Sequence, residues 1–314
     1  MMHISVLLDA ILEYLIPTDR ARADLRVIDG TLGAGGHTAA LLDAGVGQVL
    51  GLDVDPMALE IARAALAPYA DHAQVRHASY VDMAAEARAL GWSSVDGIVL
   101  DLGVSSMQLD RAERGFSFRQ DAPLDMRFDP GGSRPTAADL VNSLDEAELA
   151  ALFYRYGEEP NGRRLARAIV DQRPYQTTRE LAAVIEQAAP RRREGRRDGK
   201  APIHPATRVF QALRIAVNGE LEELEQTLPK AIDLLAPSGR LAVISFHSLE
   251  DRIVKDAFRL ASTDCICPPK LPVCVCGHKA SVRPLTRKPI TADETEIERN
   301  PRSRSAKLRV VEKL

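Results

Sequence analysis

The feature that most constrains the fold is an alternation of short apolar runs with helical stretches over the first hundred residues. Four apolar runs are predicted to be strands, at residues 26–29, 48–53, 73–77 and 96–101. Helices between successive strands are typical of parallel βα units, so the pattern predicts an open α/β sheet of the Rossmann type. Three of the runs end on aspartates, Asp29, Asp53 and Asp101. Such strand ends form the ligand-binding edge of an open α/β sheet.

The rhythm stops after Asp101 and resumes with a fifth apolar run at residues 240–246. Helices are predicted in the interval at residues 145–154, 163–172, 178–188 and 205–217, with a charged loop at 194–202. We therefore expect two domains. A discontinuous sheet domain would comprise residues 1–104 and 219–314, and an inserted helical domain would comprise residues 105–218.

Three further elements are expected in the sheet domain. Ser5 is predicted to cap an N-terminal helix in which Leu8, Ile11, Leu12 and Leu15 recur at helical spacing. A helix at residues 220–235 would lead into the fifth strand. Residues 306–312 are predicted to form a closing strand.

Charge is unevenly distributed along the chain. The formal net charge is −3, yet residues 161–214 hold thirteen basic and five acidic side chains, a local charge of +8. A basic segment on an acidic body can attract phosphates. The alternative is a set of solvated helix faces with a flexible arginine-rich loop.

Composition indicates a globular protein, since 45% of the residues are hydrophobic and 27% are charged. The first residues lack a basic region followed by an apolar run, and no stretch approaches the roughly 18 apolar residues of a membrane span. We expect a cytoplasmic protein without membrane contact.

A glycine-rich loop follows the first strand, from Asp29 to His37, and contains Gly33, Gly35 and Gly36. Glycines there allow a ligand to approach backbone N–H groups at a helix start. Asp53 stands 20 positions after Gly33, where a carboxylate can accept hydrogen bonds from ribose hydroxyls. A dinucleotide fingerprint would have glycine in place of Thr38, so the loop favours S-adenosylmethionine over a nicotinamide cofactor. A dehydrogenase and a turn without a ligand remain alternatives.

Six longer segments are chemically more specific than the glycine loop. They are Asp101-Leu102-Gly103-Val104-Ser105-Ser106-Met107-Gln108-Leu109-Asp110, Arg114-Gly115-Phe116-Ser117-Phe118, Pro123-Leu124-Asp125-Met126-Arg127, residues 204–215 from His204 to Ile215, residues 245–252 from Ser245 to Arg252, and Asn300-Pro301-Arg302-Ser303-Arg304-Ser305. In this order they resemble the signature segments of the RsmH (MraW) family, and the resemblance covers nearly the whole chain.

The resemblance implies a class I (Rossmann-like) methyltransferase sheet with an inserted helical domain. It implies methyl transfer from S-adenosylmethionine to the exocyclic N4 amine of a cytidine in the decoding region of 16S ribosomal RNA, within the small ribosomal subunit. By the same resemblance, the cofactor pocket is lined by Gly35, Gly36, His37, Asp53, Tyr80, Asp101 and Gln108. The chain departs from the family pattern at Ala122, where glycine is usual, and at Pro160, where arginine is usual.

Two residues are candidates for the chemistry. A cytosine amine is a poor nucleophile because its lone pair is delocalised, so an acceptor for its protons would assist the attack. Asp101 at a strand end can provide that acceptor or only contact the cofactor. His247, after the fifth strand, is a candidate catalytic residue whose alternative role is to anchor a loop.

RNA contacts are expected from the inserted domain. Phe116 and Phe118 can stack on a base extruded from the RNA, or they can pack in the core. Phosphate contacts are predicted for Arg208, Arg214 and the arginine-rich run that contains Arg191, Arg192 and Arg193.

All four cysteines lie close together as Cys265, Cys267, Cys274 and Cys276. In a reducing compartment a clustered set indicates a metal site, here zinc, before a disulfide framework. The C-x-C spacing differs from the C-x-x-C of zinc knuckles, so reduced thiols in a surface loop are the alternative.

Two other functions fit part of the pattern. A ribosome-assembly factor could bind RNA and use S-adenosylmethionine only structurally, but the glycine loop with Asp53 and Asp101 argues for catalysis. A DNA amino-methyltransferase would carry an Asp/Asn/Ser-Pro-Pro-aromatic string after the fourth strand, where Leu102, Gly103 and Val104 stand instead.

Overall fold

The computed structural model describes residues 5–17, 20–190, 204–268 and 273–314. The chain divides into two compact units, Met1–Gly103 with Leu221–Leu314, and Val104–Glu220. The expected boundaries lie within two residues of these. We refer to them below as the sheet unit and the helical unit.

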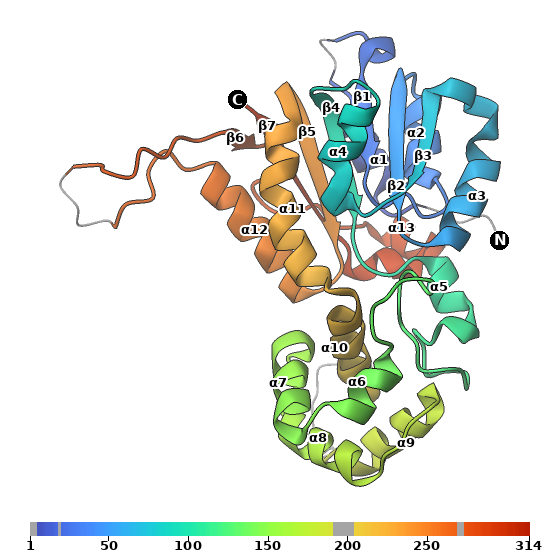
Figure 1. Ribbon diagram of the computed structural model, residues 1–314. Helices are drawn as coiled ribbons and strands as arrows, with labels where there is room; N and C mark the ends of the chain where they lie inside the picture. Colours follow the sequence, from blue (N-terminus) through green and yellow to red (C-terminus); the bar gives the residue numbers. More distant parts are fainter. Residues whose placement is uncertain (1–4, 18–19, 191–203, 269–272) are drawn as a thin grey trace. The chain divides into compact units, whose positions relative to one another are not determined.

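The sheet unit contains a seven-stranded sheet within the described residues, in the order β3-β2-β1-β4-β5-β7-β6 (Figure 1). Its strands are β1 Arg26–Asp29, β2 Gln48–Asp53, β3 Ala73–His77, β4 Val95–Asp101, β5 Leu235–Ser245, β6 Val282–Pro284 and β7 Lys307–Lys313. Strands β1 to β5 are parallel to one another, and β7 is antiparallel to both of its neighbours. The predicted open α/β sheet of the Rossmann type is confirmed. The short strand β6 was not predicted, since three residues carry no detectable period.

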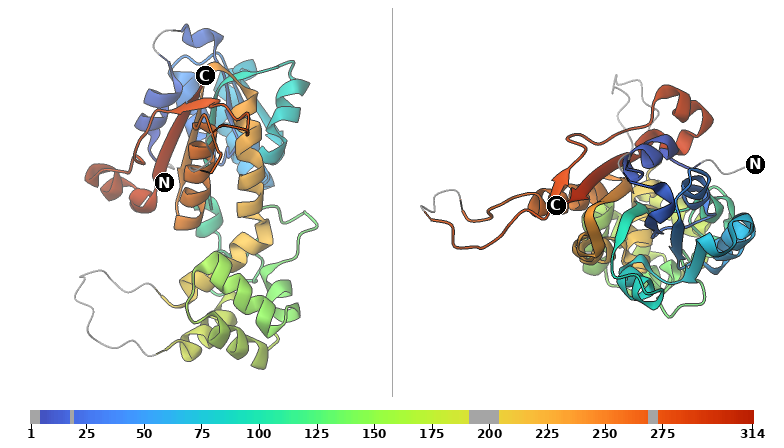
Figure 2. Two further views of the ribbon diagram at one scale, coloured as in Figure 1. Left: turned by 90° about the vertical axis from the view of Figure 1, so that its left-hand side faces the viewer. Right: turned by 90° about the horizontal axis from the view of Figure 1, so that it is seen from above.

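Alternation along the strands places a core on each face of this sheet. Val27, Val49 and Val99 pack on one face with the helices α1 (Leu8–Leu15), α2 (Gly36–Asp43) and α3 (Pro56–Leu66). Ile28, Leu50 and Leu100 pack on the other face with α4 (Met83–Ala89), α11 (Glu220–Leu234) and α12 (Ser248–Ala261). Because both faces are covered, the central strands are almost continuously apolar. Figure 2 shows these layers from two further directions.

The helices of the sheet unit connect successive strands. They are α1 Leu8–Leu15, α2 Gly36–Asp43, α3 Pro56–Leu66, α4 Met83–Ala89, α11 Glu220–Leu234, α12 Ser248–Ala261 and α13 Glu294–Arg299, with 3₁₀ turns at Arg22–Asp24, Ala67–His72, Tyr80–Asp82 and Pro301–Ser305. The prediction that Ser5 caps α1 is wrong. The N-cap residue is Leu7, with φ 52° and no side-chain cap. Its N–H donates to Oε1 of Glu296 in α13 at 2.7 Å.

The helical unit contains α5 Ser106–Asp110, α6 Ala137–Ser143, α7 Glu146–Gly157, α8 Gly162–Asp171, α9 Thr178–Ala188 and α10 Ala206–Asn218, with a 3₁₀ turn at Ala112–Arg114. The four helices predicted here are confirmed to within three residues at each end. Asp145 and Thr177 explain two of these starts, since each forms a reciprocal capping box with the residue three positions later. The predicted loop at 194–202 lies outside the described residues.

No helix in the described part of the chain combines the length and the apolarity that a bilayer crossing requires. Between α12 and β6, residues 262–268 lead away from the sheet and residues 273–281 lead back toward it (Figures 1 and 2).

Candidate functional site

Three aspartates lie at the carboxyl edge of the sheet, on adjacent strands. Asp29 ends β1, between β2 and β4. Asp29 pairs with Gly51 of β2 and with Val99 of β4. Asp53 and Asp101 therefore lie two residues further toward the carboxyl ends of these neighbouring strands. The order of connections reverses between β1 and β4, and this is the switch point at which open α/β sheets bind ligands.

The glycine loop is tied to Asp53 by backbone hydrogen bonds. Gly33 N donates to Oδ2 of Asp53 at 2.7 Å, and Asp55 N donates to Oδ1 at 2.8 Å. Gly35 is the N-cap of α2, which has no side-chain cap. A Cβ on Gly36 would collide with the hydroxyl group of Ser5. A larger residue at position 36 would therefore force the Ser5 side chain to rotate away.

His37 and Asp101 face each other across the switch point. Nδ1 of His37 lies 4.0 Å from Oδ2 of Asp101, and Nε2 lies 3.0 Å from the carbonyl oxygen of Val6. The backbone N–H of Asp101 donates to Oγ1 of Thr31. The other carboxylate oxygen, Oδ1, is buried and has no hydrogen-bond partner. A buried acceptor without a partner is costly, so this atom is suited to meet a donor from a ligand.

Burial raises the pKa of all three strand-end carboxyls. The pKa of Asp53 rises to about 6, and so does that of Asp101; that of Asp29 also rises above its ordinary value. The mutual repulsion of Asp29 and Asp101 adds to the burial effect in Asp101, whereas His37 opposes it. This cluster favours a cationic ligand and disfavours a pyrophosphate. The residues therefore fit S-adenosylmethionine, which carries a sulfonium and an ammonium group, better than a dinucleotide.

Two threonines at this edge were missed as site residues. Thr31 positions the backbone of Asp101, and Oγ1 of Thr38 donates to Oδ2 of Asp29 at 2.8 Å. The signal for Thr38 was present in the sequence, since it replaces the glycine of a dinucleotide fingerprint. Its hydroxyl supports the aspartate of β1, which a glycine could not do.

Tyr80 and Gln108 lie in different units. Tyr80 begins the 3₁₀ turn after β3 and is half-buried against the core of the sheet unit. Gln108 is buried in α5 of the helical unit, where its side-chain carbonyl accepts from Ser105 N at 2.9 Å and its own N–H donates to Ser105 Oγ. This capping box gives Gln108 a local role, and its cofactor contact stays a prediction.

His247 caps helix α12. Its Nδ1 accepts from Glu250 N at 3.4 Å. Its Nε2 lies 3.1 Å from Oε1 of Glu250 but is buried without a hydrogen bond. Oε2 of Glu250 accepts from Phe246 N at 2.8 Å. These contacts account for His247 as a loop anchor, and its catalytic role stays a prediction.

The two predicted phosphate-binding arginines of α10 differ in availability. Arg208 is 47% exposed, and its nearest acidic partner is Glu159 at 3.7 Å. Arg214 is only 14% exposed and binds Glu220 through two hydrogen bonds of 2.8 Å. Arg191, Arg192 and Arg193 lie outside the described residues. Arg208 is thus the better placed of the two described arginines for a phosphate contact.

Phe116 and Phe118 pack within the helical unit. Phe116 is buried and stacks on Phe128 with ring centroids 5.7 Å apart. Phe118 is half-buried and lies 4.6 Å from the ring of His204 and 5.0 Å from that of Phe210. Core packing explains both rings, and base stacking by either stays a prediction.

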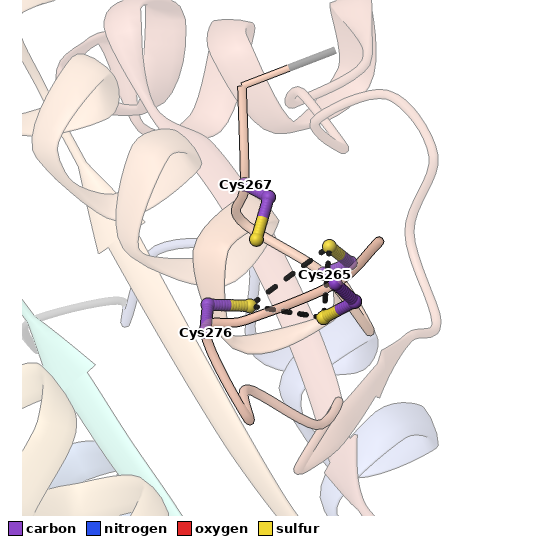
Figure 3. Close-up of side chains that lie close together, drawn as sticks. Cys265, Cys267 and Cys276 are labelled. Atoms are coloured by element: carbon purple, nitrogen blue, oxygen red, sulfur yellow. Dashed lines mark hydrogen bonds between the residues drawn. The ribbon is translucent and has the colours of Figure 1, made fainter. Parts of the chain in front are cut away.

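The four cysteines meet in the loop between α12 and β6 (Figure 3). They are free thiols, and their sulfur atoms lie within 4.8 Å of one another. Backbone N–H groups of His278 and Ile266 bound to the sulfur of Cys276 lower the pKa of that thiol to about 6. The sequence-predicted cluster is therefore brought together in space.

Comparison with known proteins identifies the family. The chain matches the MraW methylase family over residues 1–314. The chain belongs to the MraW methylase family. The resemblance expected from the sequence is confirmed, and the cofactor of this methylase is S-adenosylmethionine.

Relatives of this methylase cover almost its whole length. It is 50% identical to ribosomal RNA small subunit methyltransferase H of Oleidesulfovibrio alaskensis, over 99% of this chain and 95% of the relative. It is 51% identical to the protein of the same name from a Geobacter species, over 99% and 98%. Among solved structures, a putative methyltransferase from Streptococcus mutans in complex with SAH has a TM-score of 0.44 and 12% identity, covering 99% of this chain and 100% of that one. That likeness is too distant to place a ligand here.

Proposed function

We propose that this methylase transfers a methyl group from S-adenosylmethionine to the exocyclic N4 amine of a cytidine in the decoding region of 16S ribosomal RNA. The substrate is the RNA within the small ribosomal subunit, in the cytoplasm. Relatives about 50% identical over nearly the full length carry the name ribosomal RNA small subunit methyltransferase H. The observation that carries the proposal is the buried, unpartnered Oδ1 of Asp101 at the switch point of the sheet.

The cofactor is held by the residues at the ends of β1 and β2. Asp53, already fixed by Gly33 N and Asp55 N, accepts hydrogen bonds from the ribose hydroxyls. The loop through Gly33, Gly35, Gly36 and His37 lies next to it, and Tyr80 supplies an aromatic ring for the adenine. When bound, S-adenosylmethionine supplies an electrophilic methyl group on a sulfonium. Gln108 also contributes to cofactor binding.

Asp101 acts on the nucleophile. Its Oδ1 accepts a hydrogen bond from the cytosine amine, which localises the nitrogen lone pair and orients it for in-line attack. Nε2 of His37 is held by the carbonyl oxygen of Val6, and Nδ1 of the same ring faces Oδ2 of Asp101 at 4.0 Å, so the ring influences the carboxylate electrostatically and not through a hydrogen bond. The carboxylate takes up the proton that the amine loses. His247 acts by holding the loop after β5.

The helical unit recognises the RNA. Its basic side chains attract phosphates, with Arg208 and the run at Arg191, Arg192 and Arg193 as the principal contacts and Arg214 as a supporting one. Phe116 and Phe118 shape the region that receives the extruded base. The basic balance of residues 161–214, +8 on a chain of net charge −3, supports this role.

Mass-spectrometric mapping of ribosomal RNA tests the function. In a strain that lacks this protein, one N4-methyl group should disappear from a cytidine of 16S RNA, and the wild-type gene should restore it. Complementation with Asp101→Asn should restore little of it. Unchanged 16S RNA, or the loss of a methyl group from DNA instead, would refute the proposal.

A further inference from the structure

The loop from Ser262 to Ser281 has no buried side chain among its described residues, 262–268 and 273–281. It connects α12 with β6, and its described residues form no helix or strand. At its base, Ser281 N donates to the carbonyl of Ala261 at 2.8 Å, and Ala280 N donates to Oδ1 of Asp264 at 3.2 Å. Beyond the base, its aliphatic side chains face solvent, with Ile266 exposed to 50%, Val273 to 69% and Val275 to 77%.

The sulfur atoms nonetheless converge in this loop. The Sγ atom of Cys265 lies 3.4 Å from that of Cys274 and 3.9 Å from that of Cys276, and the last two are 3.6 Å apart. Figure 3 shows the sulfurs of Cys265, Cys267 and Cys276 gathered in one place. Thiol groups are weak hydrogen-bonding partners, whereas each ordered residue costs on the order of 1 kcal/mol of conformational entropy. Contacts between neutral thiols cannot hold such a loop.

We infer that the four cysteines bind one zinc ion as a structural Cys₄ site. Zinc–thiolate bonds of about 2.3 Å in a tetrahedron place neighbouring sulfurs about 3.8 Å apart. The three sulfur separations of 3.4, 3.6 and 3.9 Å lie around this value. Residues two apart on an extended chain point to the same side, so each C-x-C segment can present both thiolates to one ion.

The backbone around the cluster also suits thiolate ligands. Val275 N donates to Sγ of Cys267 at 3.4 Å. Gly277 has φ 62°, a conformation that glycine adopts without steric cost. The backbone N–H of the following residue, His278, donates to the sulfur of Cys276. Such N–H···S bonds stabilise the negative charge that four thiolates bring to a divalent cation. The ring of His278 is not a ligand, since its Nε2 lies 3.0 Å from the carbonyl oxygen of Leu260.

A disulfide framework fits less well. A disulfide requires a sulfur–sulfur distance of about 2.05 Å, and the sulfurs of Cys265, Cys274 and Cys276 are 3.4 to 3.9 Å apart. Pairing two of these cysteines would also break the set of four mutually close sulfurs. The site is structural because four protein ligands complete a tetrahedron and leave no open position for a substrate.

Metal analysis of the full-length protein tests the inference. The protein is purified under reducing conditions, incubated with zinc sulfate alone and desalted, and its zinc is measured by plasma mass spectrometry. The parent should retain one zinc ion per chain, and Cys265→Ser and Cys276→Ser should lose it. Val275→Ser is the matched control, since it alters the same exposed loop without removing a thiol and should keep the metal. His278→Ala should also keep it.

Two further readouts separate the site from adventitious binding. Cobalt in place of zinc should give the intense visible bands of tetrahedral thiolate coordination in the parent, in Val275→Ser and in His278→Ala, but not in Cys265→Ser or Cys276→Ser. A chelator should increase hydrogen exchange in the segment from Ser262 to Ser281 while β4 and β5 stay protected. The inference would be overturned if the parent protein bound no zinc although all four thiols could be titrated, or if two of the cysteines formed a disulfide.

Discussion

Oδ2 of Asp101 lies 4.0 Å from Nδ1 of His37, whose other ring nitrogen is held 3.0 Å from the carbonyl oxygen of Val6. A carbonyl can only accept, so Nε2 of His37 carries a proton. Nδ1 of His37, at 4.0 Å, is too far from Oδ2 of Asp101 to give it a hydrogen bond. Since Oδ1 of Asp101 has no partner either, this carboxylate is poorly stabilised in the free protein.

Replacing Asp101 should therefore stabilise the free protein at neutral and higher pH. Burial raises the pKa of Asp101 from 3.8 to about 6. A raised pKa means that the folded state binds the proton more tightly, so the contribution to stability is present below pH 3.8 and is lost as pH rises through 6. At pH 8 the buried charge of Asp101 lowers the free energy of unfolding by on the order of 3 kcal/mol, because each unit of pKa difference corresponds to about 1.4 kcal/mol. Asp101→Asn should recover part of this in urea unfolding at pH 8, and the gain should shrink toward pH 4.

The exposed Asp71 provides the control for this measurement. Asp71→Asn changes the net charge by the same amount without removing a buried carboxylate, so its unfolding free energy should stay near that of the parent. If Asp101→Asn changed the free energy of unfolding by the same amount at pH 4 and pH 8, ionisation of Asp101 would not be the cause of the change.

Asp53 should determine the affinity for S-adenosylmethionine. Its two oxygens hold the glycine loop through Gly33 N and the start of α3 through Asp55 N. Asp53→Ala should weaken cofactor binding by on the order of 2 to 4 kcal/mol, the range for losing charge-assisted hydrogen bonds. Isothermal titration calorimetry measures this directly, with Asp71→Ala as the matched control. An affinity equal to that of the parent would exclude Asp53 from the cofactor site.

The sequence predicted the parts of the site that depend on local pattern. Asp29, Asp53 and Asp101 could be placed on one edge because each directly follows a recognisable strand, and parallel strands end together. The start of α7 could be predicted because Asp145 and Glu148 form a capping box within four residues.

Tertiary partners could not be predicted in the same way. No local pattern indicates that His37 lies beside Asp101, 64 positions later. Nor does one indicate that Glu296 accepts a hydrogen bond from Leu7 N at the start of α1. The sequence alone makes Arg208 and Arg214 equal candidates for a phosphate contact. Only the fold shows that Arg214 is engaged by Glu220.

Arg208 and Arg214 should separate RNA binding from stability. Arg208→Ala should lower affinity for the small ribosomal subunit and reduce its salt dependence, by about 0.7 in logarithmic slope for each phosphate that the variant no longer binds. The thermal stability of Arg208→Ala should be nearly unchanged because the side chain is half-exposed and its ion pair with Glu159 is long.

Arg214→Ala should instead lower the free energy of unfolding by on the order of 3 kcal/mol, since it leaves Glu220 buried without its bidentate partner. Filter binding over a salt series and urea unfolding give the two readouts, and equal salt slopes for Arg208→Ala and the parent would contradict the proposed phosphate contact.

His247 should act through the start of α12. Asparagine is also a good N-cap residue, so His247→Asn should keep the hydrogen bond to Glu250 N, whereas His247→Ala should destabilise the protein by about 1 kcal/mol. If His247 only anchors the loop, methylation by His247→Asn should stay within a few-fold of the parent. Equal and large losses of turnover in both variants, with normal folding, would instead indicate that the imidazole takes part in the chemistry.

The hardest question is whether Asp101 accepts a proton from the cytosine amine or only contacts the cofactor. Asp101→Asn keeps the size and one carbonyl acceptor but loses the charge. If Oδ1 draws on the amine as the nitrogen attacks, the single-turnover methylation rate at saturating cofactor and RNA should fall by on the order of 10². A contact that only positions the cofactor would lower its affinity and leave that rate within a few-fold of the parent.

The pH dependence gives an independent answer from the parent enzyme. The pKa of Asp101 is raised to about 6 by burial, and only the charged form can accept a proton. The single-turnover rate should therefore be constant above pH 7 and fall as pH drops through 6, while Asp101→Asn should lack this step. The Asp71→Asn variant should reproduce the profile of the parent. A step that persists in Asp101→Asn would assign the titration to another group and leave positioning of donor and acceptor as the main source of the rate.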